Sequence, residues 1–197
     1  MLNPLMNHLR RPADVGEILD WLLRQGLMLT NTGLGNVQLT NWGRGYLEIK
    51  AQRGFGREFL RFFDRVKMQD GSACARAMEH SLPVVVPDVM ADSGFRHSLA
   101  IMERAGVRAV QSTPIRSSSG AFLGVLSTHF PGRHQPTKIE MRNVQHAAQM
   151  AADALIYARI NNLSAVDQIS RSAKLIQQSL VMIERTDLLT NSCTAKW

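Results

Sequence analysis

The order of short β and helical segments constrains the fold of this chain most. Apolar and polar residues alternate over 36–40 and again over 46–50, and a five-residue segment with two glycines separates the two runs. This pattern predicts a β-hairpin. A second hairpin is predicted from strands at 109–115 and 121–130. Because the strands come in adjacent pairs with helical segments between the pairs, an α/β fold of the α+β type is expected, with an antiparallel sheet covered by helices.

The segments around and between the hairpins complete this prediction. Asp14 and Glu17 have the spacing of a capping box, and the helix that they begin is expected to end at Gly26. Further helices are expected over 57–66, from an N-cap at Ser72 to Glu79, and over 95–105, with a buried strand at 84–86.

A Pro- and Gly-containing break at 131–136 precedes a long helical pattern without Pro or Gly. Apolar residues recur there every three or four positions, which is typical of a helix that pairs with another helix. The expected organisation is an N-terminal tail at 1–11, a core at 12–136, a dimerisation and signalling helix at 137–186 and a tail at 187–197. The candidate dimer-interface residues are Val144, Ala148, Ala151, Leu155, Ile169 and Ile176. In the alternative, the first half packs on the sheet and the second half, after a break near 161–164, is an amphipathic tail.

Length and composition favour one intracellular domain with an extension. The 197 residues are 45% hydrophobic, which is enough for one packed core. No apolar run is long enough for a membrane span, and the first eleven residues are too polar for a secretory signal, so a cytoplasmic location is expected. The only two cysteines, Cys74 and Cys193, do not suggest a disulfide framework.

The net charge of +7 is spread along the chain without a basic tail. Arginines at intervals of four would lie along one face of the helix expected at 57–66: Arg53, Arg57, Arg61 and Arg65. Acidic residues dilute this charge and phenylalanines occupy the opposite side, so the sequence favours a solvated helix face over nucleic-acid binding.

Several short segments between Leu34 and Arg159 occur in a characteristic order. They include Gly35-Asn36-Val37-Gln38-Leu39, Asp70-Gly71-Ser72-Ala73-Cys74, Val86-Pro87-Asp88-Val89, Ala105-Gly106-Val107-Arg108-Ala109 and Leu123-Gly124-Val125-Leu126-Ser127-Thr128-His129-Phe130. In this order the sequence resembles the GAF family of sensory domains, especially those ahead of the kinase core in bacterial sensor histidine kinases. The resemblance implies an antiparallel sheet of five or six strands, helices on one face that often pair between subunits, and a ligand pocket under loops on the other.

The resemblance also implies candidate ligand-binding positions. They are Cys74, Asp88, Phe95, Gln111, Thr113 and His129. Gln111, Thr113 and His129 are polar residues on otherwise apolar strands, and buried polar groups need partners. Either a ligand supplies these partners, or the side chains bond one another or the backbone. Cys74 is either a small apolar residue near a helix start or a thiol whose pKa the helix N-terminus lowers.

Three kinds of site are not expected. Bilin-binding relatives carry a cysteine nine residues before the glycine that matches Gly106, where this chain has His97, so covalent bilin is not expected. Related reductases of free methionine sulfoxide place their catalytic cysteine in a segment that resembles 95–100, which here contains none. The histidines do not show the spacing of metal ligands. The cofactor is therefore unknown.

The resemblance leads to a functional hypothesis and an alternative. The first is a non-catalytic sensory or regulatory domain that binds a small effector, forms a homodimer and has a histidine kinase or other signalling protein as partner. The alternative is a ligand-free dimerisation or adaptor module for a separate kinase or transcription factor.

Overall fold

The computed structural model describes residues 15–161. The chain divides into two compact units, 1–156 and 157–197, and the following paragraphs concern the described part of the first. Its centre is a six-stranded sheet with the order β3-β2-β1-β6-β5-β4, in which all neighbours are antiparallel. The strands are β1 (Leu34–Asn41), β2 (Tyr46–Arg53), β3 (Arg65–Lys67), β4 (Val84–Val86), β5 (Ala109–Arg116) and β6 (Phe122–Phe130). The predicted α+β class, with its antiparallel sheet and flanking helices, is confirmed.

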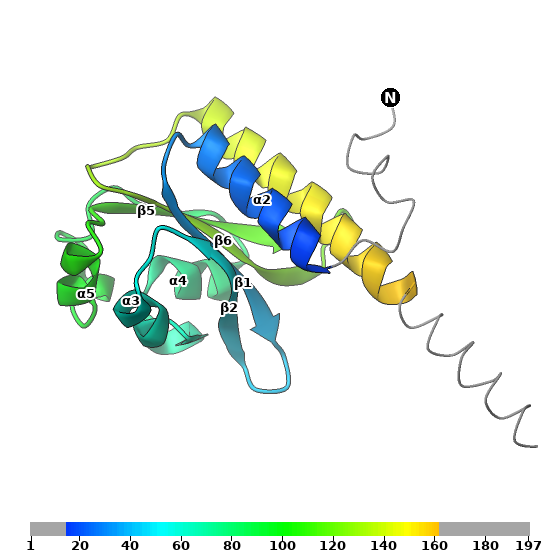
Figure 1. Ribbon diagram of the computed structural model, residues 1–197, viewed down its shortest axis with the longest axis horizontal. Helices are drawn as coiled ribbons and strands as arrows, with labels where there is room; N and C mark the ends of the chain where they lie inside the picture. The colour runs from blue at the N-terminus through cyan, green and yellow to red at the C-terminus, as the bar shows by residue number, and fades with distance from the viewer. Residues whose placement is uncertain (1–14, 162–197) are drawn as a thin grey trace, which may run out of the picture. The chain divides into compact units, whose positions relative to one another are not determined.

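Helices cover both faces of the sheet. The helix α2 (Val15–Leu29) packs on β1, β2 and β6, and a helix that begins at residue 138 lies beside it on the same face (Figure 1). The other face carries α3 (Arg57–Phe62), α4 (Ala73–His80) and α5 (Leu99–Arg104), together with the short 3-10 helices η1 (Met68–Asp70) and η2 (Ser93–Phe95). We call these the α2 face and the α4 face. Because neighbouring residues of a strand point to opposite faces, each strand contributes side chains to both the α2 face and the α4 face.

The first helix extends beyond its predicted end and packs closely on β6. The expected stop at Gly26 is wrong, because α2 continues to Leu29. A Cβ atom on Gly26 would lie 2.8 Å from Cδ2 of Leu126, so this glycine lets the helix approach the sheet closely. The contact also shows that Leu126 points to the α2 face.

The arginine stripe predicted on one helix does not form. The helix α3 ends at Phe62, and Arg65–Lys67 is the strand β3, which pairs with β2. Arg53 lies in β2 and Arg65 in β3, so only Arg57 and Arg61 share a helix. The physical reason is the burial of Val66, which is paired with Leu47 in the core.

The middle of the chain follows the prediction in part. The helix α4 begins after Ser72, whose Oγ accepts a hydrogen bond from the Ala75 backbone N–H at 3.4 Å, as expected for an N-cap. The strand predicted at 84–86 is β4. The single helix predicted over 95–105 is instead divided between η2 and α5, because η2 turns around the side chain of Asp92.

The helix that begins at residue 138 is packed within the first unit. Its N-terminus is capped by Thr137, whose Oγ1 accepts from the Glu140 backbone N–H at 3.1 Å. Four candidate dimer-interface residues, Val144, Ala148, Ala151 and Leu155, are buried at 7% exposure or less within this one chain. Their burial agrees with the alternative in which the first half of the helix packs on the sheet, and it leaves these side chains little surface for a partner.

The remaining predictions for the C-terminal part lie outside the described residues. These are Ile169, Ile176, the break near 161–164, the helix end at 186 and the two tails. Within 15–161, no helix combines the length and the apolar content that crossing a membrane requires.

Candidate functional site

A small cavity of about 20 Å³ lies between the sheet and the helices of the α4 face. Its apolar wall includes Phe59 and Phe63 from α3 and its C-cap, and Phe95 from η2. Its polar wall comes from the sheet and from the start of α4. The volume is enough for about one water molecule.

Three buried polar side chains at the cavity lack hydrogen-bond partners. Asn36 and Gln38 of β1 and His129 of β6 are at most 4% exposed. Asn36 Oδ1, Gln38 Oε1 and His129 Nδ1 all lack a partner among the described residues 15–161. Two serines beside them satisfy each other, because Ser112 Oγ and Ser127 Oγ are 2.8 Å apart. The cavity is therefore lined by polar atoms whose hydrogen-bonding capacity is unused.

His129 is held in a neutral state among aromatic rings. Its ring meets those of Phe55 and Phe59 edge to face, with centroids 4.9 and 5.7 Å away. Burial lowers the pKa of His129 to about 3, since no carboxylate compensates for the desolvation of the imidazolium. Near neutral pH the imidazole is uncharged, and one ring nitrogen is an acceptor.

Cys74 lines the cavity from the first turn of α4. Its Sγ lies 3.3 Å from Ser72 Oγ. Burial raises the pKa of the Cys74 thiol, and this effect exceeds the opposing hydrogen bond from Ser72. The hypothesis that the helix N-terminus makes this thiol acidic is therefore wrong, and the buried small-residue interpretation fits the structure.

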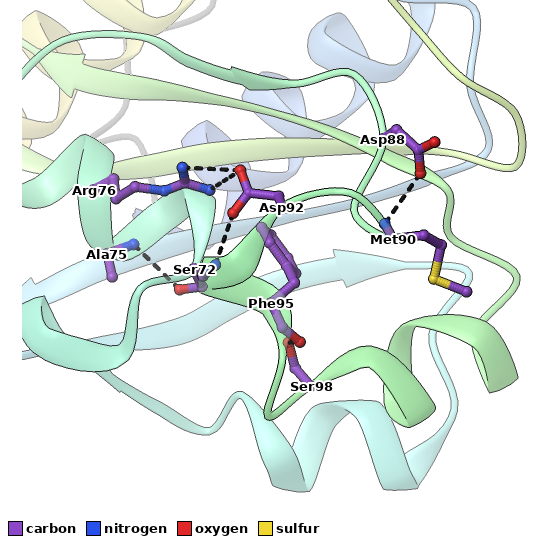
Figure 2. A network of polar contacts seen from close by, with 9 residues as sticks. Ser72, Ala75, Arg76, Asp88, Met90, Asp92, Phe95 and Ser98 are labelled. Carbon is purple, nitrogen blue, oxygen red and sulfur yellow. Dashed lines mark hydrogen bonds and ion pairs between the residues drawn. The ribbon is translucent and has the colours of Figure 1, made fainter.

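Phe95 forms a fixed wall of the cavity because its turn is anchored by an ion pair. Both Arg76 Nη atoms donate to Asp92 Oδ2 at 3.1 Å, and Asp92 Oδ1 accepts from the Gly94 backbone N–H at 2.9 Å. Figure 2 shows Asp92 between Arg76 and the turn that carries Phe95. Gly94 also touches Gly71, since a Cβ atom on Gly94 would lie 2.4 Å from the Gly71 carbonyl oxygen.

Asp88 does not line the cavity but joins three segments beside it. Its carboxylate accepts from Arg108 Nη2 at 2.7 Å, from Arg133 Nε at 2.8 Å and from the Met90 backbone N–H at 3.0 Å, the last of which is drawn in Figure 2. The hydrogen bond from Arg108 is the largest effect that lowers the pKa of Asp88, to about 2. Asp88 thus connects the loop after β4 to the start of β5 and to the segment that precedes the last described helix.

Gln111 and Thr113 face away from the cavity. Gln111 pairs with Thr128, and Thr113 pairs with Leu126, which contacts α2. Directly paired residues point to the same face, so Gln111 and Thr113 belong to the α2 face. Of the six candidate positions, Cys74, Phe95 and His129 line the cavity, whereas Asp88, Gln111 and Thr113 do not.

Several polar residues of the cavity were not among the positions predicted from the sequence. They are Asn36, Gln38, Ser72, Ser112 and Ser127. The polar residues on both sides of Val37 were a usable signal, because this alternation places Asn36 and Gln38 on one face of β1.

Comparison with known families decides what kind of domain this is. The model of the GAF domain matches residues 14–155, which is most of the chain. The chain belongs to the GAF domain family. GAF domains are typically sensory or regulatory domains in signalling, and none of the curated proteins compared with this chain matches its sequence.

Solved structures share the fold of this GAF domain at low sequence identity. A domain described as part of a two-component sensor histidine kinase from Sinorhizobium meliloti 1021 is 16% identical, with a TM-score of 0.66 over 78% of this chain and 98% of that one. A GAF domain/HD domain protein from Geobacter sulfurreducens is 14% identical, with a TM-score of 0.64 over 76% and 96%. The blue-light absorbing form of the Thermosynechococcus elongatus PixJ GAF domain is 16% identical, with a TM-score of 0.57 over 85% and 96%.

A wider groove of about 370 Å³ adjoins the cavity of this GAF domain. Phe63 and Ser72 line both spaces, so they form part of the wall between them. Asp70 and His97 give the groove a polar rim. Across residues 15–161, no group of three or more His, Cys, Asp or Glu side chains is arranged to hold a metal ion.

Proposed function

We propose that this GAF domain is a sensory module in signal transduction that reversibly binds a small uncharged effector in the cavity beside His129. The observation that carries the proposal is the set of three unpartnered polar atoms on Asn36, Gln38 and His129. Leaving buried polar atoms without partners is costly, and a bound ligand would supply the missing hydrogen bonds.

The lining favours a flat, uncharged molecule that carries hydrogen-bond donors. Asn36 Oδ1 and Gln38 Oε1 are acceptors, so they suit N–H or O–H groups of a ligand. Among the described residues, no Lys, Arg, Asp or Glu side chain lines the cavity, and a buried phosphate or carboxylate would need compensating charge. Phe59, Phe63 and Phe95 offer ring surfaces to an aromatic or heteroaromatic ligand.

Entry of such a ligand requires the cavity to widen. Phe63 follows the last residue of the six-residue helix α3, and it lies between the cavity and the groove. A rotation of this side chain would join the two spaces. Phe95, anchored through Asp92 and Arg76, would stay in place as the opposite wall.

The response would reach the C-terminal part of the chain through its last described helix. Asp88 ties the loop beside the cavity to Arg133, which precedes that helix. The domain would act in the cytoplasm, without catalysis, as a homodimer. Of the region 137–186 that follows the core at 12–136, the part after the segment packed on the sheet would join the two chains. The likeness to the sensor kinase domain from S. meliloti supports a histidine kinase or another signalling protein as the partner.

A second candidate is a ligand-free adaptor that dimerises and partners a separate kinase or transcription factor. The small cavity volume of about 20 Å³ favours it. The unpartnered polar atoms favour the sensor, because an adaptor has no use for them.

Calorimetric titration and thermal unfolding with a ligand panel distinguish the two candidates. The panel contains uncharged heteroaromatic compounds with N–H donors, such as purine bases, and the same rings carrying a phosphate. For the sensor, at least one uncharged member raises the Tm, and a ligand at 100 times its Kd adds about 2.7 kcal/mol to the free energy of unfolding. Its phosphorylated counterpart has no effect.

Matched variants test whether the response comes from the cavity. Gln38→Met removes an amide from the cavity face and should abolish the Tm shift. Gln111→Met removes the same group from the α2 face, and the Tm shift caused by the ligand should remain. A panel in which no compound binds the wild-type protein would support the adaptor instead.

A further inference from the structure

A second group of unpartnered polar atoms lies on the α2 face of the sheet. Gln111 and Thr113 of β5 and Thr128 of β6 are each 1% exposed. Within the part of the chain that the structure describes, no hydrogen-bond partner reaches Gln111 Nε2, Gln111 Oε1, Thr113 Oγ1 or Thr128 Oγ1. The cavity beside His129 contains none of these side chains.

Strand register brings these side chains together. Gln111 is directly opposite Thr128, and Thr113 follows two positions later on the same face of β5. Cross-strand partners have Cβ atoms about 5 Å apart. The three side chains are therefore neighbours on the α2 face, and we call them the cluster.

The helix over this side of the sheet offers the cluster no hydrogen bonds. Ser118, in the turn between β5 and β6, donates from its backbone N–H and its hydroxyl to Asp153 Oδ1, which ties that turn to the last described helix on the α2 face (Figure 1). The buried residues of that helix include Ala147, Ala148, Ala151 and Ala152. Alanine has no polar side-chain atom, and the backbone groups within a helix already bond one another.

The composition of the cluster selects the class of ligand. Nε2 of Gln111 only donates, Oε1 only accepts, and the two threonine hydroxyls do both. A cation would face the donor and an anion would face the acceptor, whereas water serves both. Buried polar groups of proteins are commonly satisfied by such internal water molecules.

We propose that Gln111, Thr113 and Thr128 form a binding site for ordered water between the sheet and the alanine-rich face of the helix that begins at residue 138. The site is separate from the ligand cavity and does not rest on the proposed function.

A crystal structure of the full chain at high resolution tests the site directly. Water density is expected within hydrogen-bond distance of Gln111 and Thr128. In solution, water-to-amide cross-relaxation at these two residues is expected for the wild-type protein. It should be lost in the triple variant Gln111→Met, Thr113→Val and Thr128→Val, in which the site is apolar.

The sign of a stability change gives an independent readout. Thr128→Val keeps the shape of the side chain and removes the hydroxyl. If water satisfies this hydroxyl, the variant breaks the network and lowers the Tm by about 2 °C or more. If the hydroxyl is dry and unsatisfied, its removal raises the Tm.

The control variant is Ile115→Val, on the same strand and the same face as Gln111, and it should leave the water signals unchanged. Absence of water density in the wild type, or a raised Tm in Thr128→Val, would overturn the proposal.

Discussion

His129 combines two roles that depend on one side chain. It contributes an unpartnered Nδ1 to the cavity, and its ring packs against Phe55 and Phe59. The imidazole meets both requirements only while it is neutral, because an imidazolium in this position would be buried without a counter-charge. Protonation of His129 should therefore couple the stability of the whole domain to pH.

The predicted coupling has a definite sign. The pKa of His129 is about 3 in the folded protein, below the ordinary value of 6.5. Between these two pH values the unfolded chain binds more protons than the folded chain does. The stability that neutral His129 contributes is therefore fully present above pH 6.5 and decreases as the pH falls toward 3. The free energy of unfolding should decrease by up to about 1.4 kcal/mol per pH unit in this window. Urea unfolding between pH 7 and pH 5 measures the slope.

Two histidine variants isolate this effect. His129→Gln removes the titrating ring and should flatten the slope between pH 7 and pH 5, whereas His97→Gln changes an exposed ring and should preserve it. The pKa values of Asp88 and Glu48 are about 2 in the folded protein. The stability that these carboxylates contribute is therefore lost mainly at a pH below the window from pH 7 to pH 5. An unchanged slope in His129→Gln would show that this histidine is not the buried titrating group.

The sequence could identify polar strand residues but not the layer that each one faces. Gln111, Ser112 and Thr113 are consecutive and all buried, because β5 is covered on both faces. A strand buried on both sides lacks the alternation that would show which face meets the cavity. The resemblance therefore predicted Gln111 and Thr113 as ligand-binding positions, whereas the structure places Ser112 at the cavity.

At the scale of the elements, the pairing of β1 with β6 depends on one glycine. Gly124 lies opposite Leu39, and a Cβ atom built on it would be 2.0 Å from the backbone oxygen of Gln38. A backbone atom cannot move aside as a flexible side chain can. Gly124→Ala should therefore separate two central strands and lower the free energy of unfolding by about 3 kcal/mol, measured by urea denaturation.

Gly132 provides the matched control for this substitution. No atom of residues 15–161 outside its chain neighbours lies within 4 Å of a Cβ atom built there, so Gly132→Ala should change the free energy of unfolding by less than about 0.5 kcal/mol. Equal effects of the two variants would contradict the packing argument, because the difference rests only on the space around each glycine.

Elements with strong local patterns were predictable, whereas short elements held by distant contacts were not. The alternation and turn residues of β1 and β2 predicted their hairpin, and Ser72 predicted the start of α4. The strand β3 has three residues and depends on pairing with β2. The 3-10 helix η2 depends on Asp92 and on its ion pair with Arg76. Neither contact is visible in the local sequence.

At the scale of the whole molecule, one apolar pattern in the sequence packs within its own chain in one part and is proposed to serve a second purpose, contact between two chains, in another. The residues spaced by threes and fours from Val144 to Leu155 are buried within their own chain. The same spacing continues at Ile169 and Ile176, outside the described residues. A single periodic pattern can thus change its partner along its length, since the spacing specifies an apolar face but not the surface that covers it.

Two charge substitutions separate these purposes. Leu155→Arg places a charge in the interior of the first unit, so it should lower the Tm at every protein concentration and act on folding. Ile169→Arg lies on the part of the pattern proposed to join two chains, so it should halve the mass found by light scattering and leave monomer folding intact.

A mass that stays dimeric in Ile169→Arg would place the interface elsewhere. A Leu155→Arg protein that unfolds like wild type would contradict the burial of this side chain in its own core. Because each variant affects a different measurement, the pair separates packing within one chain at Leu155 from the proposed contact between chains at Ile169.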